Sequence, residues 1–264
     1  MKNWILVILV SVLSILKIYS QNITFKDPNF KYALVNLNVV DTNLDGIYDG
    51  DVDTNNDKEI SISEAEAVVS LSLNYFSTKE IPEIYFFKNL KYFYSLTGQI
   101  AQFPDINRLP LIENLSFALL KDTIVEIIAH PNIKRCTLSV REPLKKLSIN
   151  QNAKLNYLNI YTYVGSPMPA IDTLDVSNNV LDTFICKAIK PRILESYFSC
   201  SNNKLTSVVN LPINSFYTSN LSNNNLNAQL IGFEGKNLDL SANRFSSLTI
   251  KMYNGCLLYT SRCV

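Results

Sequence analysis

The sequence contains few of the residues on which most catalytic sites depend. Its 264 residues include one histidine and seven glycines. The histidine, His130, stands next to Pro131 in a position of a hydrophobic repeat, so we interpret it as structural. No Ser-His-Asp or Cys-His arrangement can be built around it, and no glycine-rich phosphate loop is present. We therefore expect a protein that is not an enzyme.

The chain also lacks a large net charge and a disulfide pattern. Its 24 basic and 23 acidic residues give a net charge of +1, which provides no reason to expect nucleic acid or an anionic membrane surface as a partner. Of five cysteines, Cys256 and Cys263 lie in the C-terminal segment, which leaves Cys136, Cys186 and Cys200. This odd, widely spaced set predicts no disulfide framework. We expect Cys136 and Cys200 to be buried, since both occupy repeat positions.

Two terminal segments differ from the rest in composition. Residues 1–20 combine Lys2, an apolar run from Trp4 to Leu16, and small or polar residues around Ser20, which is typical of a cleaved secretory signal peptide. The run is shorter than the ~20 apolar residues of a membrane span, and no later segment could span a membrane. Residues 256–264, CLLYTSRCV, begin with six residues encoded by one frame of the transposase end sequence used in DNA-library preparation. We interpret them as a non-native tail after a truncated repeat region.

The most informative pattern is a hydrophobic repeat with a period of roughly twenty residues. It is plainest in LDVSNNVL, residues 174–181, and LDLSANRF, residues 238–245. The asparagines of this motif, Asn179, Asn203, Asn224 and Asn243, are 24, 21 and 19 residues apart. Upstream that asparagine is missing, but three copies of one apolar frame follow at steps of 22 and 21 residues: Ile81, Ile84, Phe87, Leu90, Phe93; Phe103, Ile106, Leu109, Ile112, Leu115; and Ile124, Ile127, His130, Ile133, Cys136.

This is leucine-rich-repeat spacing. Each apolar stretch alternates like a strand with one buried face, and one repeat cannot bury that face alone. Residues 71–255 therefore predict an α/β solenoid, a leucine-rich-repeat horseshoe with a parallel concave β-sheet. Asparagine suits the turn because its amide can bond backbone groups that a bend leaves unpaired. An array of amphipathic helices is the alternative, although asparagine, serine and threonine crowd every repeat and disfavour helix interiors.

Residues 21–70 predict a small helical N-terminal cap with an acidic loop. A calcium ion needs several oxygens at short range, and alternate residues of a tight loop can present them. Lys58 stands at the sixth loop position, where glycine is usual, and should weaken binding. Positions one, three, five, seven, nine and twelve of the loop are Asp53, Asn55, Asp57, Glu59, Ser61 and Glu64. The preceding half of the segment offers Asp41, Asn43, Asp45 and Asp49 as further candidate Ca²⁺ ligands.

The acidic segment also has a purely structural interpretation. Ser61 and Glu64 are spaced as a capping box that opens a helix, with the Asp and Asn residues forming a solvated turn. Both interpretations can hold, because the last ligand of such a loop lies in the exiting helix. On the entering side, Asp27 caps and Pro28 starts a helix. One face of that helix would carry Phe30, Ala33, Leu34 and Leu37.

With these features the chain resembles the secreted leucine-rich-repeat proteins of bacteria, and it is similar in outline to internalins, whose helical cap is EF-hand-like. The resemblance rests on FKDPNFKYALVN, DVDTNNDKEISISEAEAV and IPEIYFFKNLKYF and covers residues 25–255. It implies a solenoid and secretion, and it is weak for the ligand.

The sequence as a whole predicts a recognition or adhesion module, secreted or attached to the cell surface, that binds a protein or glycan through the concave face. A passive stalk, or the accessory repeat region of a larger secreted protein such as a hydrolase, remains an open alternative. Residues between the repeat positions point out of the sheet, and exposed tyrosine suits binding, although tyrosine is also simply favoured in strands. The candidate ligand-binding residues are Tyr92, Tyr94, Asn114, Arg135, Tyr157, Asn159, Tyr161, Asp175 and Tyr197.

Overall fold

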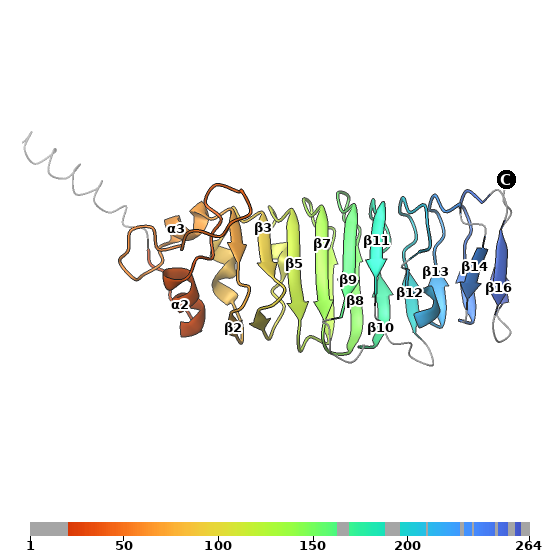
Figure 1. Cartoon of the computed structure of the whole chain (residues 1–264), viewed down its shortest axis with the longest axis horizontal. Coiled ribbons are helices and arrows are strands. Elements are labelled where there is room, and N and C mark those ends of the chain that lie inside the picture. Colours follow the sequence, from red (N-terminus) through yellow and green to blue (C-terminus); the bar gives the residue numbers. More distant parts are fainter. Residues whose placement is uncertain are drawn as a thin grey trace, which may run out of the picture.

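The computed structural model describes residues 21–162, 169–187, 196–209, 211–227, 230–233, 235–245, 248–252 and 257–259. The predicted signal peptide and most of the predicted non-native tail lie outside these residues. The chain winds into coils that stack side by side along one axis, with helices α2 and α3 at one end (Figure 1). No helix in this part of the chain is long and apolar enough to cross a membrane. The stacked parallel strands confirm the predicted solenoid.

Helix α2 spans Pro28–Asn36 and begins as the sequence predicts. The Asp27 side chain accepts a hydrogen bond from the Asn29 backbone N–H, at 2.8 Å, and proline fills the first turn. The helix ends at Asn36, so Leu37, which was expected on the buried face, has extended backbone and is exposed. The other three residues predicted on that face are buried: Phe30, Ala33 and Leu34.

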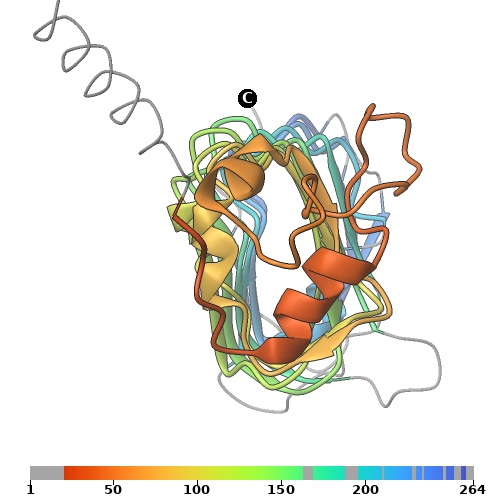
Figure 2. The same cartoon turned by 90° about the vertical axis from the view of Figure 1, so that its left-hand side faces the viewer.

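Helix α3 spans Ile62–Ala67 and starts with the predicted capping box. The Ser61 side chain accepts a hydrogen bond from the Glu64 backbone, and the Glu64 carboxylate accepts one from the Ser61 backbone. Viewed along the stack, the coils superimpose as an oval, and the two helices lie across its near end (Figure 2).

One long side of the coils is a six-stranded parallel sheet, the first sheet. Its strands in order are β1 (Ser70–Ser72), β3 (Tyr92–Ser95), β5 (Asn114–Leu119), β7 (Arg135–Val140), β9 (Tyr157–Tyr161) and β11 (Thr183–Cys186). The register aligns one buried side chain from each coil: Leu71, Phe93, Leu115, Cys136, Leu158 and Phe184. The 22- and 21-residue steps of the upstream repeat are thereby confirmed at Phe93, Leu115 and Cys136, whereas Ile124, the first residue of the third copy, is 58% exposed.

The opposite long side is a second parallel sheet, of seven strands. These are β6 (Ile124–Ile128), β8 (Leu144–Asn150), β10 (Ile171–Asp175), β12 (Tyr197–Ser199), β13 (Thr218–Asn220), β15 (Asn237–Asp239) and β17 (Leu257–Tyr259). The motifs that contain Asn179 and Asn243 belong to this sheet, and so do Ile124 and Ile127 of the third upstream copy. The last residue of each upstream copy, Phe93, Leu115 or Cys136, lies in the first sheet. In the sequence the two sheets look like a single repeat, because strands on either side of a coil bury alternate apolar residues in the same way.

Shorter elements complete the coils. Strand β2 (Ser77–Thr78) pairs with β4 (Gln99–Ile100), and β14 (Leu230–Phe233) pairs with β16 (Thr249–Met252). The 3-10 helices are η1 (Pro82–Phe86), η2 (Ile106–Arg108) and η3 (Ile213–Ser215). Wherever both long sides are strands, their spacing is the same, about 4.8 Å. Because successive coils are equally far apart on both long sides, the stack does not curve, and it runs nearly straight in Figure 1.

A ladder of buried or half-buried asparagines joins successive coils at one turn. Asn203 Oδ1 accepts a hydrogen bond from the Leu181 backbone N–H of the preceding coil, at 3.0 Å. Its Nδ2 donates to the Val176 and Cys200 carbonyls, one in the preceding coil and one in its own, both at 3.0 Å. The amide therefore satisfies backbone groups that the bend leaves without strand partners, as predicted. Equivalent contacts recur at Asn152, Asn179, Asn224 and Asn243.

The residue before each ladder position has a left-handed backbone. This conformation is uncommon for residues with a Cβ, and asparagine tolerates it best. Its recurrence in successive coils shows that the turn keeps one geometry. The φ values are 54° at Ala129, 58° at Gln151, 56° at Asn178, 55° at Asn202, 55° at Asn223 and 53° at Ala242.

His130 takes the place of the ladder asparagine in the coil of β6. Its backbone N–H donates to Asn152 Oδ1 at 2.8 Å, and its ring Nε2 lies 3.0 Å from the Leu109 carbonyl. Ring Nδ1 accepts the Ile133 N–H at 3.0 Å, so only the neutral imidazole with its proton on Nε2 satisfies both contacts. The side chain is buried, and burial lowers the pKa of His130. Its structural role agrees with the sequence interpretation.

Replacing Asn203 with alanine should lower the free energy of unfolding by about 3 kcal/mol, because a buried N–H and two carbonyls lose their partner. Asn202→Gly is the matched control. Its side chain is exposed and glycine accepts the left-handed backbone, so the loss should stay below about 1 kcal/mol. Urea denaturation followed by circular dichroism measures both. Equal losses would show that the ladder amide contributes no more than its exposed neighbour.

The depressed pKa of His130 makes the fold sensitive to acid. The neutral imidazole contributes fully above its unfolded pKa of ~6.5, and this contribution is lost as the pH falls from there through the folded-state value. The free energy of unfolding should therefore fall as the pH drops below ~6.5, and less steeply in His130→Asn, which supplies the amide used in the other coils. Parallel pH profiles for parent and variant would contradict this.

Candidate functional site

The outward face of the first sheet carries two rows of side chains that, apart from Ile185, are polar or aromatic. Along each row, residues of successive coils stand next to one another in register. From β3 to β11 every side chain in the rows is at least partly exposed, because it alternates with the buried set. The first row is Ser70, Tyr92, Asn114, Arg135, Tyr157 and Thr183, and the second is Ser72, Tyr94, Ser116, Thr137, Asn159 and Ile185.

Most of the predicted ligand-binding residues lie together on this face. Asp175 and Tyr197 do not, because they belong to β10 and β12 of the second sheet. The single predicted strip is therefore divided between opposite sides of the coils, and its last two members are placed incorrectly. The residues that the structure brings together are Tyr92, Tyr94, Asn114, Arg135, Tyr157, Asn159 and Tyr161.

Contacts between neighbouring coils order this face. The Arg135 guanidinium carbon lies 4.0 Å from the centre of the Tyr157 ring, a cation–π contact. Immediately before β7 and β5, Lys134 Nζ lies 2.6 Å from the Glu113 carboxylate, and its hydrogen bond lowers the pKa of Glu113. Side chains that are already ordered lose less conformational entropy when a ligand binds.

A hollow of about 450 Å³ opens where the first sheet meets the loop of residues 41–48; we call it the tyrosine hollow. Its walls include Tyr48 from the loop and Tyr92 and Tyr94 from β3. The rings of Tyr48 and Tyr94 have centres 6.2 Å apart and planes inclined at 75°, so the two rings form an almost perpendicular corner. The other lining residues are Asp41, Leu44, Gly46, Ser70 and Asn74.

Tyr48 was missed at the sequence level, although a tyrosine between acidic loop residues is a visible signal. Its hydroxyl lies 3.3 Å from Ser70 Oγ, and burial raises the pKa of Tyr48 to about 12, so the phenol is neutral at physiological pH. Bulky side chains on left-handed backbone stand nearby. Leu44 lines the hollow with φ 62°, and Tyr75, which follows Asn74, has φ 63° and is 92% exposed. Such strain is typical of functional sites.

The predicted calcium loop folds around its own carboxylates. Asp53 is buried, and its oxygens accept the backbone N–H groups of Asp57, at 3.0 Å, and Lys58, at 2.8 Å. Glu64 reaches back from α3 to the Asn55 backbone N–H, at 3.3 Å. Burial alone would raise the pKa of Glu64, but the hydrogen bonds to its carboxylate outweigh burial and lower it.

The preceding loop repeats this arrangement. Asp41 accepts the backbone N–H groups of Asp45, at 3.2 Å, and Gly46, at 2.9 Å. Gly46 and Lys58 hold equivalent positions and both have positive φ, 92° and 66°. Lys58 therefore adopts the left-handed backbone that glycine would take without strain. Asn43 Oδ1 also accepts the Asp45 N–H, at 3.0 Å.

Several predicted ligands make other contacts. Glu59 pairs with Lys31 at 2.6 Å, Ser61 Oγ donates to Glu64 at 2.7 Å, and Asp49 accepts the Thr42 hydroxyl at 2.9 Å. Among the residues that the structure describes, no three Asp, Glu, His or Cys side chains are grouped closely enough to hold a metal ion. The donor set fits Ca²⁺ only when asparagine amides and backbone carbonyls join the carboxylates, as they do in calcium loops.

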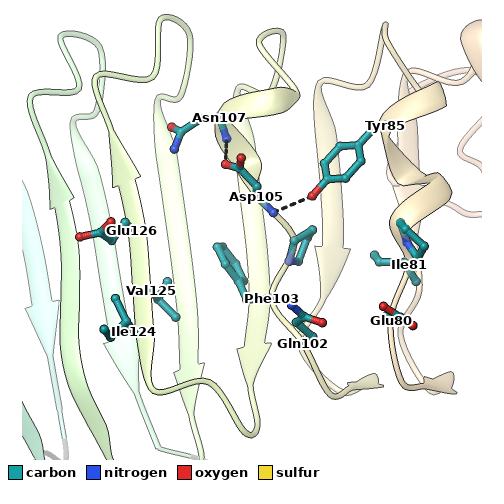
Figure 3. A pocket seen from close by; sticks show the side chains of 12 residues that line it. Glu80, Ile81, Tyr85, Gln102, Phe103, Asp105, Asn107, Ile124, Val125 and Glu126 are labelled. Carbon is teal, nitrogen blue, oxygen red and sulfur yellow. Dashed lines mark hydrogen bonds between the residues drawn. The ribbon is translucent and has the colours of Figure 1, made fainter.

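A second hollow, of about 520 Å³, is drawn in Figure 3. Its lining includes Tyr85, Phe103 and Ile124, which come from three successive coils. The Tyr85 hydroxyl accepts the Asp105 backbone N–H at 2.9 Å, and the Arg108 guanidinium carbon lies 3.6 Å from the Tyr85 ring centre. None of the predicted ligand-binding residues lines this hollow.

Proteins similar to this chain are found among solved structures. No family model matches the chain, and no curated protein matches it. Among solved structures, the chain is similar to an internalin, inlF from Listeria monocytogenes str. 4b F2365, over 90% of this chain and 91% of that chain, with 13% sequence identity and a TM-score of 0.35. The solenoid is established by the strand pairing described above.

Proposed function

We propose that the protein is a secreted or cell-surface recognition module, without enzymatic activity, that binds a protein or glycan through the outward face of the first sheet. The observation that supports this most is the register of the two rows, which places tyrosine, arginine, amide and hydroxyl groups side by side over successive coils. Tyrosine and arginine are enriched among residues that dominate binding energy.

The first sheet is favoured over the second because of its aromatic content. Among the described side chains, the outward positions of the second sheet include one aromatic residue, Tyr197. They also carry the ion pair of Lys146 with Glu126, at 2.7 Å. Six strands about 4.8 Å apart give the first sheet a width of about 24 Å, enough to engage a protein surface or an extended glycan.

Tyr157→Ala should weaken ligand binding at least about tenfold, because a central aromatic side chain and its contact with Arg135 are lost. The ligand is first identified on a glycan array or a panel of cell-surface proteins, and its affinity for each variant is measured by surface plasmon resonance. Thermal melts show whether the variant retains the fold.

Tyr197→Ala is the matched control for this test, since it removes the same side chain from the opposite side of the coils. It should leave the affinity unchanged. A ligand that loses affinity only through Tyr197→Ala would place recognition on the second sheet and refute the proposal.

We also propose that Ca²⁺ stabilises the cap by binding the loop that begins at Asp53. The support is the repeated loop geometry, in which Asp53 and Asp41 occupy equivalent positions and Glu64 closes the second loop from α3. A bound ion would draw on these carboxylates, on the Asn55 amide and on the Glu59 backbone carbonyl.

Calcium at about a hundred times its dissociation constant should stabilise the fold by roughly 2.7 kcal/mol, which thermal melts with Ca²⁺ and with EDTA resolve. Asp53→Ala should abolish the difference. Lys58→Gly should enlarge it, because glycine takes the positive φ without strain and removes a positive charge. Identical melting temperatures with and without EDTA would show that the loop is only a turn and a helix cap.

A further inference from the structure

We propose that the tyrosine hollow binds a quaternary ammonium group such as that of choline. This inference rests on the proposed recognition function and names a ligand class for the N-terminal end of the same face. Such a group has no N–H to donate and is attracted to the faces of aromatic rings.

The rings of the tyrosine hollow have the arrangement that an ammonium group requires. Tyr48 and Tyr94 meet at 75° with their centres 6.2 Å apart, and Tyr92 stands two residues before Tyr94 on the same side of β3. A cation is attracted when it lies within about 6 Å of a ring centre. A trimethylammonium group set in this corner contacts more than one ring, and the volume of about 450 Å³ leaves room for the rest of the ligand.

The charges around the hollow favour a cation. Its lining contains one carboxylate, Asp41, and no lysine or arginine. Residues 41–64 carry eight carboxylates and a single basic residue, Lys58. The resulting potential attracts an ammonium ion and disfavours phosphate or carboxylate ligands.

Polar groups that line the hollow already have partners within the protein. The Tyr48 hydroxyl already contacts Ser70, and the Asp41 oxygens already accept backbone N–H groups of the loop. A sugar or a primary ammonium group needs several free partners when it is desolvated, whereas a quaternary ammonium group needs none. The lining therefore suits the quaternary group better.

Calorimetric titration with choline chloride tests the proposal, with EDTA present so that the acidic loops carry no metal. The uncharged analogue 3,3-dimethylbutan-1-ol has the same shape and should bind at least about tenfold more weakly. Tyr94→Leu removes the ring but keeps apolar bulk, and it should weaken choline binding at least about fivefold. Tyr94→Phe keeps the ring face and should bind as the parent does.

Tyr32→Leu is the control, because Tyr32 is exposed on α2, outside the hollow, and its loss should leave choline binding unchanged. Circular dichroism checks each fold, and Tyr92→Leu replaces Tyr94→Leu if the latter unfolds. Absence of choline binding, equal affinity for the uncharged analogue, or tighter binding of glucose than of choline overturns the proposal. If choline fails while Tyr157→Ala still weakens the macromolecular ligand, the ammonium site is refuted and the recognition face is retained.

Discussion

The asparagine ladder is the constraint on which the rest of the structure depends. Each ladder amide accepts an N–H from the preceding coil, and from Asn179 onward each also donates to carbonyls of two coils. The amides therefore fix both the bend and the register of neighbouring turns. Without such a partner, a buried bend would leave polar backbone groups unsatisfied, at a cost of about 1–3 kcal/mol for each group. His130 extends the same scheme by one coil with an imidazole in place of an amide.

The fixed register between coils aligns exposed side chains of successive strands into one continuous binding surface. Because the coils align residue by residue, Tyr92, Asn114, Arg135 and Tyr157 form a row, and ordered side chains bind with a smaller entropic loss. The N-terminal cap adds a concave site to this otherwise continuous surface. Its acidic loop brings Tyr48 against Tyr94, which creates a concave aromatic corner beside an otherwise continuous sheet face.

Much of this architecture could be predicted from the sequence. The spacing of apolar residues gave the solenoid, Asp27 and Ser61 gave the helix starts, and the motif asparagines gave the turn. The two sheets could not be separated, because a strand on either side of a coil buries alternate residues in the same pattern, and so Asp175 and Tyr197 were placed on the wrong face. Tyr48 was visible as a tyrosine between acidic residues, but its contact with Tyr94 depends on how the loop lies against β3, which no local pattern encodes.

Amide hydrogen exchange tests the central claim that the ladder holds the coils together. The backbone N–H groups bonded to ladder side chains belong to His130, Asn152, Leu181, Leu205 and Leu226, and none of these is bonded through a strand pair. If the amides hold the turns, these N–H groups should exchange as slowly as those inside the strands, through cooperative opening of the solenoid. Exchange at the rate of exposed loops would show that the ladder does not hold the turns.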